Sequence, residues 1–91
     1  MISLVNGVVR AISLDKVIVG VGGLGLSLAV TQKTTAQLNL GVQVQLFTTL
    51  VVREDALTLY GFLEDGDRAL FELVQTVSGI GPKVALSIVS A

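Results

Sequence analysis

The spacing of apolar residues changes once along this chain of 91 residues, close to residue 64. Before that point, runs rich in Val, Leu, Ile and Thr are broken by glycines, which is typical of short β-strands joined by turns. The clearest alternation, Val42-Gln43-Val44-Gln45-Leu46, indicates a strand with one buried face and one wet face. Residues 34–40 break the pattern as a short helical turn would, and the predicted strands cover residues 2–5, 8–14, 16–21, 26–31, 42–52 and 56–62. Six short strands in about 60 residues predict a small closed barrel.

From residue 65 onward the apolar residues repeat with helical spacing. A first amphipathic helix is predicted by the i, i+3, i+4, i+7 set Leu70, Leu73, Val74 and Val77. Asp65 and Asp67 are its N-cap candidates and favour the positive end of the helix dipole, and Gly79 is placed to end it. Pro82 is suited to open a second helix, because its missing N–H has no partner in a first turn. The apolar stripe predicted for that helix is Val84, Ala85, Ile88 and Val89.

The amino-acid composition excludes several kinds of functional site. The chain has no Cys and no His, so it can form no disulfide, no Cys/His zinc site and no His-dependent catalytic group. Charged residues make up 14% and hydrophobic residues 52%, with six Lys and Arg against seven Asp and Glu. Soluble domains average about 25% charged residues. So much apolar surface on a small chain predicts a buried partner surface, most simply self-association.

The stretch between residues 17 and 52 carries a single charge, Lys33, and raises the question of a membrane span. Its first part contains several glycines and its second part many Thr, Gln and Asn residues, whereas a span needs about 18–20 predominantly apolar residues. No basic segment precedes an apolar block at the start, as a signal peptide requires. We therefore expect a soluble, cytoplasmic protein that does not contact a membrane.

A first candidate site is Gly20-Val21-Gly22-Gly23-Leu24-Gly25, which fits the G-x-G-x-x-G pattern of dinucleotide-binding loops. Such a loop needs a helix to open at its third glycine. Residues 26–30 instead alternate as a strand does, and no acidic residue lies between Asp15 and Glu54 to hold a ribose. We interpret the segment as a glycine-rich bend between barrel strands.

A second candidate is Ser78-Gly79-Ile80-Gly81-Pro82-Lys83, between the two predicted helices. Its glycines permit a tight turn and the close approach of a ligand, and its Ile is expected to fill the space between the helices. The first N–H groups of the second helix have no intrahelical partner, so a phosphate oxygen suits them, and Lys83 adds a positive charge. An ordinary helix–turn–helix corner is the alternative. The whole string favours phosphate binding.

A third candidate is Arg53-Glu54-Asp55, between two predicted strands. Adjacent carboxylates could bind Mg²⁺ or act in acid–base chemistry, as in a metal-dependent nuclease. Such an enzyme needs further ligands, and the sequence has no His and no convincing second set. From the spacing alone, a solvated hairpin tip is the plainer interpretation.

Three segments are distinctive together: residues 51–62 (VVREDALTLYGF), 70–73 (LFEL) and 78–86 (SGIGPKVAL). In order and spacing they resemble the amino-terminal part of the RuvA family, which binds Holliday junctions in the bacterial branch-migration complex. The resemblance implies a mainly β fold with α elements. An OB-fold β-barrel over residues 1–63 would serve oligomerisation and carry an acidic pin, and residues 64–91 would form the first helix-hairpin-helix of a truncated second domain.

The resemblance also implies a function and its residues. The function is structure-specific, non-catalytic binding of four-way junction DNA in recombination, repair and the SOS response to DNA damage. Glu54 and Asp55 would form the acidic pin, whose carboxylates repel converging phosphates near the centre of a four-fold tetramer. The residues expected to bind the DNA backbone are Gly79, Ile80, Gly81, Lys83 and Arg53. No catalytic residue, metal or cofactor is implied.

Partners follow from the same resemblance. They are four-way junction DNA, further copies of the chain in a tetramer or octamer, a RuvB-type ATPase and a RuvC-type resolvase. The region that contacts the ATPase is expected beyond Ala91, so the chain resembles an N-terminal fragment. Gly25-Leu26 stands where the family usually has Gly-Tyr, which we interpret as a change in packing. Few basic residues are present to release counterions, so we expect weak junction binding. The alternative is an oligomerisation core alone, with DNA binding lost by truncation.

Overall fold

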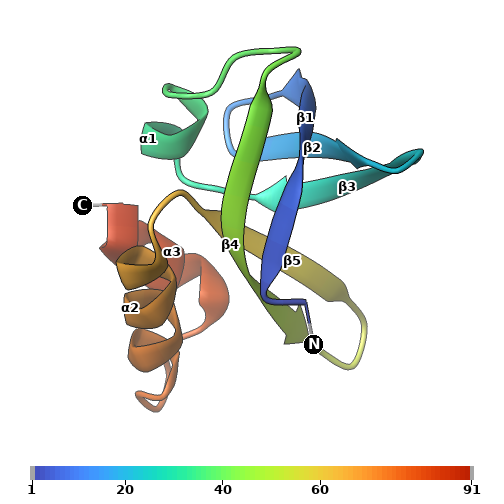
Figure 1. The fold of residues 1–91 in the computed structure, drawn as a ribbon. Helices are drawn as coiled ribbons and strands as arrows, with labels where there is room; N and C mark the ends of the chain where they lie inside the picture. The colour runs from blue at the N-terminus through green and yellow to red at the C-terminus, as the bar shows by residue number, and fades with distance from the viewer. Residues whose placement is uncertain (1, 91) are drawn as a thin grey trace.

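The computed structural model describes residues 2–90, which form a β-barrel with helices on one side of it (Figure 1). The strands are β1 (Leu4–Ile12), β2 (Lys16–Val21), β3 (Leu24–Ala29), β4 (Gln43–Val52) and β5 (Leu57–Phe62). The helices are α1 (Gln32–Thr35), α2 (Asp65–Gln75) and α3 (Pro82–Ser90). The barrel closes in the order β1-β2-β3-β5-β4, which is consistent with the predicted OB-fold. None of the helices in this part of the chain has the length and apolar character that a membrane crossing requires.

Neighbouring strands of the barrel are antiparallel except at one place. β3 and β5 run parallel, with Leu28 opposite Leu59 and Ala29 opposite Tyr60. The barrel interior is filled by aliphatic side chains from every strand and from the segment after β3: Val5, Val9, Val17, Val19, Leu28, Val30, Leu46 and Leu59. The alternation predicted along the strands therefore sorts their side chains between this interior and the outer surface.

The prediction of six strands is wrong by one, because the strands predicted over residues 2–5 and 8–14 are two parts of the single strand β1, Leu4–Ile12. Gly7 does not interrupt this strand. It is buried where β1 lies against β2, and a Cβ there would overlap the carbonyl oxygen of Gly20. Glycine is therefore needed here because the backbones of β1 and β2 come close together. The sequence pattern alone cannot distinguish such a glycine from one that forms a turn.

The glycine-rich segment is confirmed as a bend between strands. Gly22 and Gly23 form the turn of the β2–β3 hairpin, and β3 follows directly instead of a helix. The predicted strand over residues 26–31 is displaced, because β3 ends at Ala29 and Thr31 caps α1. The Thr31 hydroxyl accepts a hydrogen bond from the Thr34 amide at 3.1 Å, so the short helix begins before the predicted range of 34–40.

The two predicted helices are present, with different ends. Pro82 opens α3 as predicted. The N-cap of α2 is Glu64, so the N-cap prediction for Asp65 and Asp67 is wrong; both lie in the first turn, where their charges still favour the helix dipole. The helix ends at Gln75, before Gly79, because the chain turns from Thr76 onward. The helix-hairpin-helix assignment of this pair stays a prediction.

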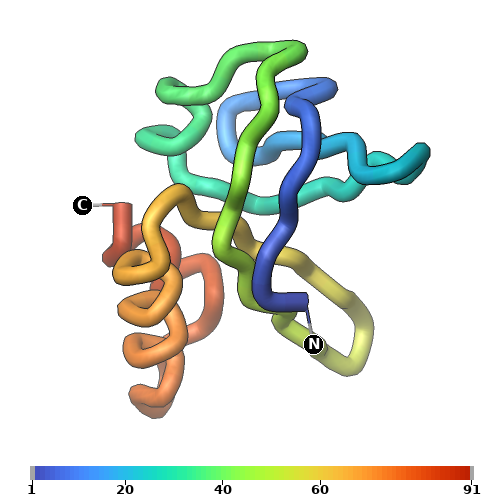
Figure 2. Tube along the Cα trace, viewed as in Figure 1, coloured from blue at the N-terminus to red at the C-terminus, as the bar shows by residue number. Residues whose placement is uncertain are grey.

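The helical pair lies beside β4 and β5 (Figure 2). A second core joins it to the barrel there. Phe71 of α2 is fully buried, with ring centroids 4.8 Å from Tyr60 and 5.1 Å from Phe62 on β5. Ala85 and Val89 of α3 complete this aromatic core. Alternate residues of β5 face the barrel interior and the helices, so the strand is buried on both sides.

Three of the four residues in the predicted stripe of α2, and two of the four in that of α3, do not enter this core. The exposed members are Leu70, Leu73, Val77, Val84 and Ile88. Each helix is apolar over a wider arc than the contact with one barrel face can cover, so periodicity identified the helices but not which part of the arc is buried.

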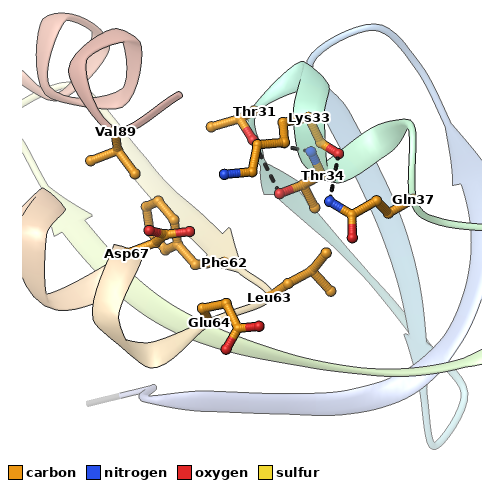
Figure 3. Close-up of a pocket in the computed structure, with 9 residues that line it drawn as sticks. All are labelled: Thr31, Lys33, Thr34, Gln37, Phe62, Leu63, Glu64, Asp67 and Val89. Carbon is orange, nitrogen blue, oxygen red and sulfur yellow. Dashed lines mark hydrogen bonds between the residues drawn. The ribbon is translucent and has the colours of Figure 1, made fainter. Parts of the chain in front are cut away.

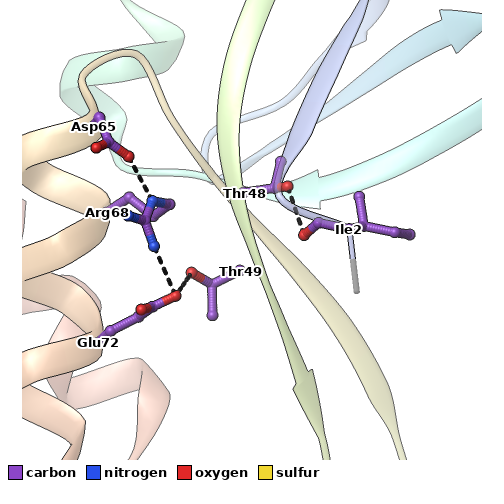
Figure 4. A network of polar contacts seen from close by, with 6 residues as sticks. All are labelled: Ile2, Thr48, Thr49, Asp65, Arg68 and Glu72. Atoms are coloured by element: carbon purple, nitrogen blue, oxygen red, sulfur yellow. Dashed lines mark hydrogen bonds and ion pairs between the residues drawn. The ribbon is translucent and has the colours of Figure 1, made fainter.

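A polar network also fixes α2 against β4 (Figure 4). The Arg68 guanidinium contacts Asp65 at 2.6 Å and Glu72 at 2.9 Å, and the Thr49 hydroxyl of β4 donates to Glu72 at 2.7 Å. At the start of β1, the Thr48 hydroxyl donates to the carbonyl oxygen of Ile2 at 2.9 Å. Exposed ion pairs add about 0–1 kcal/mol each, so the network orients α2 while the aromatic core provides most of the stability.

Candidate nucleic-acid interface

The Arg53-Glu54-Asp55 segment lies on the hairpin that joins β4 and β5. The Arg53 amide donates to the Ala56 carbonyl oxygen at 2.8 Å, which closes a tight turn. Glu54 and Asp55 occupy the tip of this turn, and both are exposed. The solvated hairpin tip expected from the spacing is therefore observed, with two carboxylates at its end.

The second candidate segment forms the connection between α2 and α3. Gly79 has a φ of 85°, in the left-handed region that strongly favours glycine, and no atom stands within 4 Å of where its Cβ would be. Backbone conformation, and not space, therefore selects glycine here. Ile80 is half-buried and packs against the aromatic core, so it fills the space between the helices as predicted. This contact fixes the turn relative to the barrel.

Arg53 and the helical connection meet at one place. A Cβ built on Gly81 would lie 3.6 Å from Nη2 of Arg53, so the guanidinium group reaches the backbone that precedes α3. A cavity of about 350 Å³ opens beside this contact. Its lining comes from both sides of the junction between barrel and helices: Val51, Arg53, Ala56, Thr58, Tyr60, Gly81, Pro82, Lys83 and Val84. Two cations from distant parts of the sequence thus border one cavity, which we call the junction cavity.

The structure brings only part of the predicted site together. Arg53, Gly81 and Lys83 border the junction cavity, whereas Gly79 and Ile80 do not. The acidic pair is also outside it, at the hairpin tip. Across residues 2–90, no group of three or more His, Cys, Asp or Glu side chains is arranged to hold a metal ion.

Tyr60 and Thr58 are lining residues that the sequence patterns did not identify. Burial raises the pKa of the Tyr60 phenol above its ordinary value, and the nearby positive charge of Arg53 opposes part of that rise. Tyr60 is the single tyrosine of the chain and lies on the outer face of β5 with Thr58. The alternation of β5 placed them on that face, but nothing in the pattern showed that Arg53 would lie beside it.

A second cavity, of about 240 Å³, separates α1 from the helical pair (Figure 3). Lys33 extends from α1 towards α2 and α3, and the opposite wall carries Glu64 and Asp67. With two carboxylates and one amine, this cavity has the opposite charge balance to the junction cavity. It therefore offers a polyanion no comparable site.

Barrel, helical connection and cavity together define a class of protein: a small barrel joined to a helical pair, with two basic side chains, Arg53 and Lys83, at the cavity where they meet. The profile of the family described as RuvA N terminal domain matches residues 1–61. The chain belongs to the RuvA family.

Curated relatives extend the match beyond the barrel. The chain is 53% identical over 87 residues to the Holliday junction branch migration complex subunit RuvA of Acidothermus cellulolyticus, which covers 96% of this chain and 44% of that protein. The protein of the same name from Beutenbergia cavernae is 52% identical over 90 residues, covering 99% and 45% respectively. That from Streptomyces avermitilis is 49% identical over 85 residues, covering 93% and 42%. The chain thus spans less than half the length of these relatives.

Proposed function

We propose that this chain binds the sugar–phosphate backbone of four-way junction DNA, as part of the non-catalytic subunit of a branch-migration complex. The observation that supports this most is the meeting of Arg53, Gly81 and Lys83 at one cavity. Its relatives are named as subunits of the Holliday junction branch migration complex. Arg and Lys side chains at a groove suit phosphate contacts, which hold DNA without reading its sequence.

Each group at the junction has a defined task in this proposal. The amides at the start of α3 have no partner one turn back, so they donate to a phosphate oxygen, and Lys83 in the same turn adds a charge. Gly81 lets the phosphate approach the backbone closely. Arg53 holds a neighbouring phosphate from the barrel side.

Glu54 and Asp55 act by repulsion. They lie at the exposed tip of the hairpin that also carries Arg53, so their negative charges would face any DNA bound next to this tip. In a four-fold assembly, four such tips near the centre would repel phosphates and keep the strands apart at the crossover. Attraction along the arms and repulsion at the centre would favour a junction over a plain duplex.

Self-association is the second part of the proposal. Val52 and Leu57 lie opposite each other at the base of the acidic hairpin and are 64% and 70% exposed. Large apolar side chains beside the tip suit contacts with neighbouring copies, which would bring the tips towards one another. The alternative function, an oligomerisation core without DNA binding, is favoured by the net charge of −1.

A labelled four-way junction and a linear duplex of equal length, titrated at low salt in a gel-shift assay, test the proposal. We expect the chain to bind the junction weakly and in preference to the duplex, and Lys83→Glu to abolish that binding. Lys33→Glu is the matched control, since it makes the same charge change beside Glu64 and Asp67.

The two functions give different results in this assay. An equal loss of junction binding in Lys83→Glu and Lys33→Glu would mean that binding depends only on the overall charge of the chain. That result would contradict a binding site at the junction cavity. An oligomer by light scattering that binds neither DNA would establish the alternative.

A further inference from the structure

A groove of about 480 Å³ adjoins the junction cavity on the other side of Lys83. Its floor crosses three strands, because Lys16 lies opposite Ala29 and Ala29 lies opposite Tyr60. Residues directly opposite one another in a sheet share a face, so these side chains form one row on the outside of the barrel. Ala29 is the small member, and it leaves the hollow between the larger two. We call this the α3 groove.

One face of α3 forms the wall of the groove. Lys83, Leu86, Ser87 and Ser90 all line it, and they have the spacing of a single helical face. From Lys83 to Ser90 this face is about 10 Å long at 1.5 Å per residue. That length exceeds the spacing of about 3.4 Å of helix axis per phosphate on a DNA strand. The groove is therefore long enough to follow a backbone, and not only to hold one anion.

The hydrogen-bond donors in the groove are largely uncommitted. Ser87 and Ser90 donate their hydroxyl protons to carbonyl oxygens of α3, at 3.2 and 3.0 Å. Within residues 2–90, in contrast, the side chains of Lys16, Lys83 and Tyr60 donate no hydrogen bond to the protein. Two amines and a phenol thus face the same hollow with protons available for an acceptor.

Charge is divided between the two sides of the helical pair. Among the ion pairs formed within residues 2–90, Arg68 is the one basic residue of the six that takes part. Three of the other five border the junction cavity or the α3 groove: Arg53, Lys83 and Lys16. The carboxylates of α2 lie on the side that faces β4 and α1 (Figures 3 and 4). Among the described residues that line the groove, Asp15 is the one with a carboxylate side chain, and it lies next to Lys16.

We infer that the α3 groove continues the DNA-binding surface, with Lys16 as an additional phosphate contact. One strand of a duplex arm would run from Arg53 past Lys83 to Lys16, with the Tyr60 phenol donating from the floor. Asp15, beyond Lys16, would mark the end of the path by repelling the next phosphate. This inference rests on the proposed function, and it assigns a direction to the arm as it leaves the helical connection.

NMR titration of the isotope-labelled chain with a short linear DNA duplex at low salt tests the inference and detects weak binding. We expect the amide signals of residues 79–83 and those of Lys16, Gln32 and Ser87 to shift along one binding curve. We expect Lys16→Ala to weaken binding by about tenfold or more, as for loss of a hydrogen bond to a charged group. In the same variant, the plot of log affinity against log salt concentration should become less steep, with its negative slope smaller in magnitude by about 0.9.

Two variants separate a contact from a structural effect. Lys16→Arg keeps the charge on β2 and should restore binding, and Lys33→Ala removes a charge elsewhere and should change affinity less than twofold. Shifts confined to residues 79–83, or equal effects of Lys16→Ala and Lys33→Ala, would overturn the inference and leave the proposed function standing. No shift at either place, with the duplex or with a four-way junction of the same arm length, would overturn both. Saturation of the groove by inorganic phosphate as readily as by DNA would make it a small-anion site and overturn the inference.

Discussion

Tyr60 reports directly on the junction between barrel and helices, because it is the single tyrosine and the chain has no tryptophan. Its pKa is raised by burial, and Arg53 lowers it in part. An absorbance titration of the phenol should therefore show a midpoint above the ordinary value near 10. Arg53→Gln should move the midpoint higher still, because the cation that stabilises the phenolate is removed. An unchanged midpoint in this variant would place Arg53 away from Tyr60.

The same pKa shift has a consequence for stability. The pKa of Tyr60 is higher in the folded state than in the unfolded state. At alkaline pH the unfolded chain therefore loses the phenol proton before the folded chain does, which favours unfolding. The stability that this side chain contributes is fully present below about pH 10. It is lost as the pH rises through the folded-state pKa.

Glu54 and Asp55 are exposed, so their substitution should affect binding and not folding. In the proposed function, the double variant Glu54→Gln, Asp55→Asn should bind a linear duplex several-fold more tightly and so lose preference for the junction. Gel-shift titrations of both DNAs measure this ratio, and urea unfolding of the variant is the control. Mg²⁺-dependent cleavage of the junction that disappears in Glu54→Gln would instead identify a nuclease.

Helices α2 and α3 depend on the barrel for their stability, because both are short and share the aromatic core with β5. Phe71→Ala should destabilise the protein by about 3–5 kcal/mol, as for other fully buried aromatic residues. Leu73→Ala, on the same helix but 65% exposed, should change the free energy of unfolding by less than about 0.5 kcal/mol. Urea denaturation measures both, and equal losses would contradict the packing described for α2.

Elements differ in how far the amino-acid sequence predicts them. Strand alternation and the opening of α3 at Pro82 follow from local chemistry, so they could be predicted. Gly7 was interpreted as a break because the neighbouring strand that makes glycine necessary is distant in sequence. The contact between Arg53 and Gly81 could not be predicted for the same reason, because it depends on how Phe71 packs the helices against the barrel. Local chemistry indicated the glycines and Lys83 of the helical connection, the resemblance added Arg53, and packing determined their arrangement.

Over the molecule as a whole, exposed apolar side chains predict association. Light scattering after gel filtration should give a mass that is a multiple of 9.5 kDa. Leu57→Lys, at the base of the acidic hairpin, should reduce that mass, because it places four like charges together in a four-fold assembly. Leu14→Lys is a matched control, since Leu14 is also 70% exposed and lies on the β1–β2 turn. A monomeric wild-type chain would remove the basis for a central pin.

The parallel contact of β3 with β5 is the shortest pairing in the barrel, limited to Leu28 with Leu59 and Ala29 with Tyr60. It is the seam at which the ring should open first, so amide hydrogen exchange is expected to be faster there than between β1 and β2. Tyr60 and Ala29 also form the floor of the α3 groove. A DNA strand bound in that groove would contact both β3 and β5 and hold them together. DNA binding would therefore slow the local opening of the barrel, and amide exchange at this contact would slow with it.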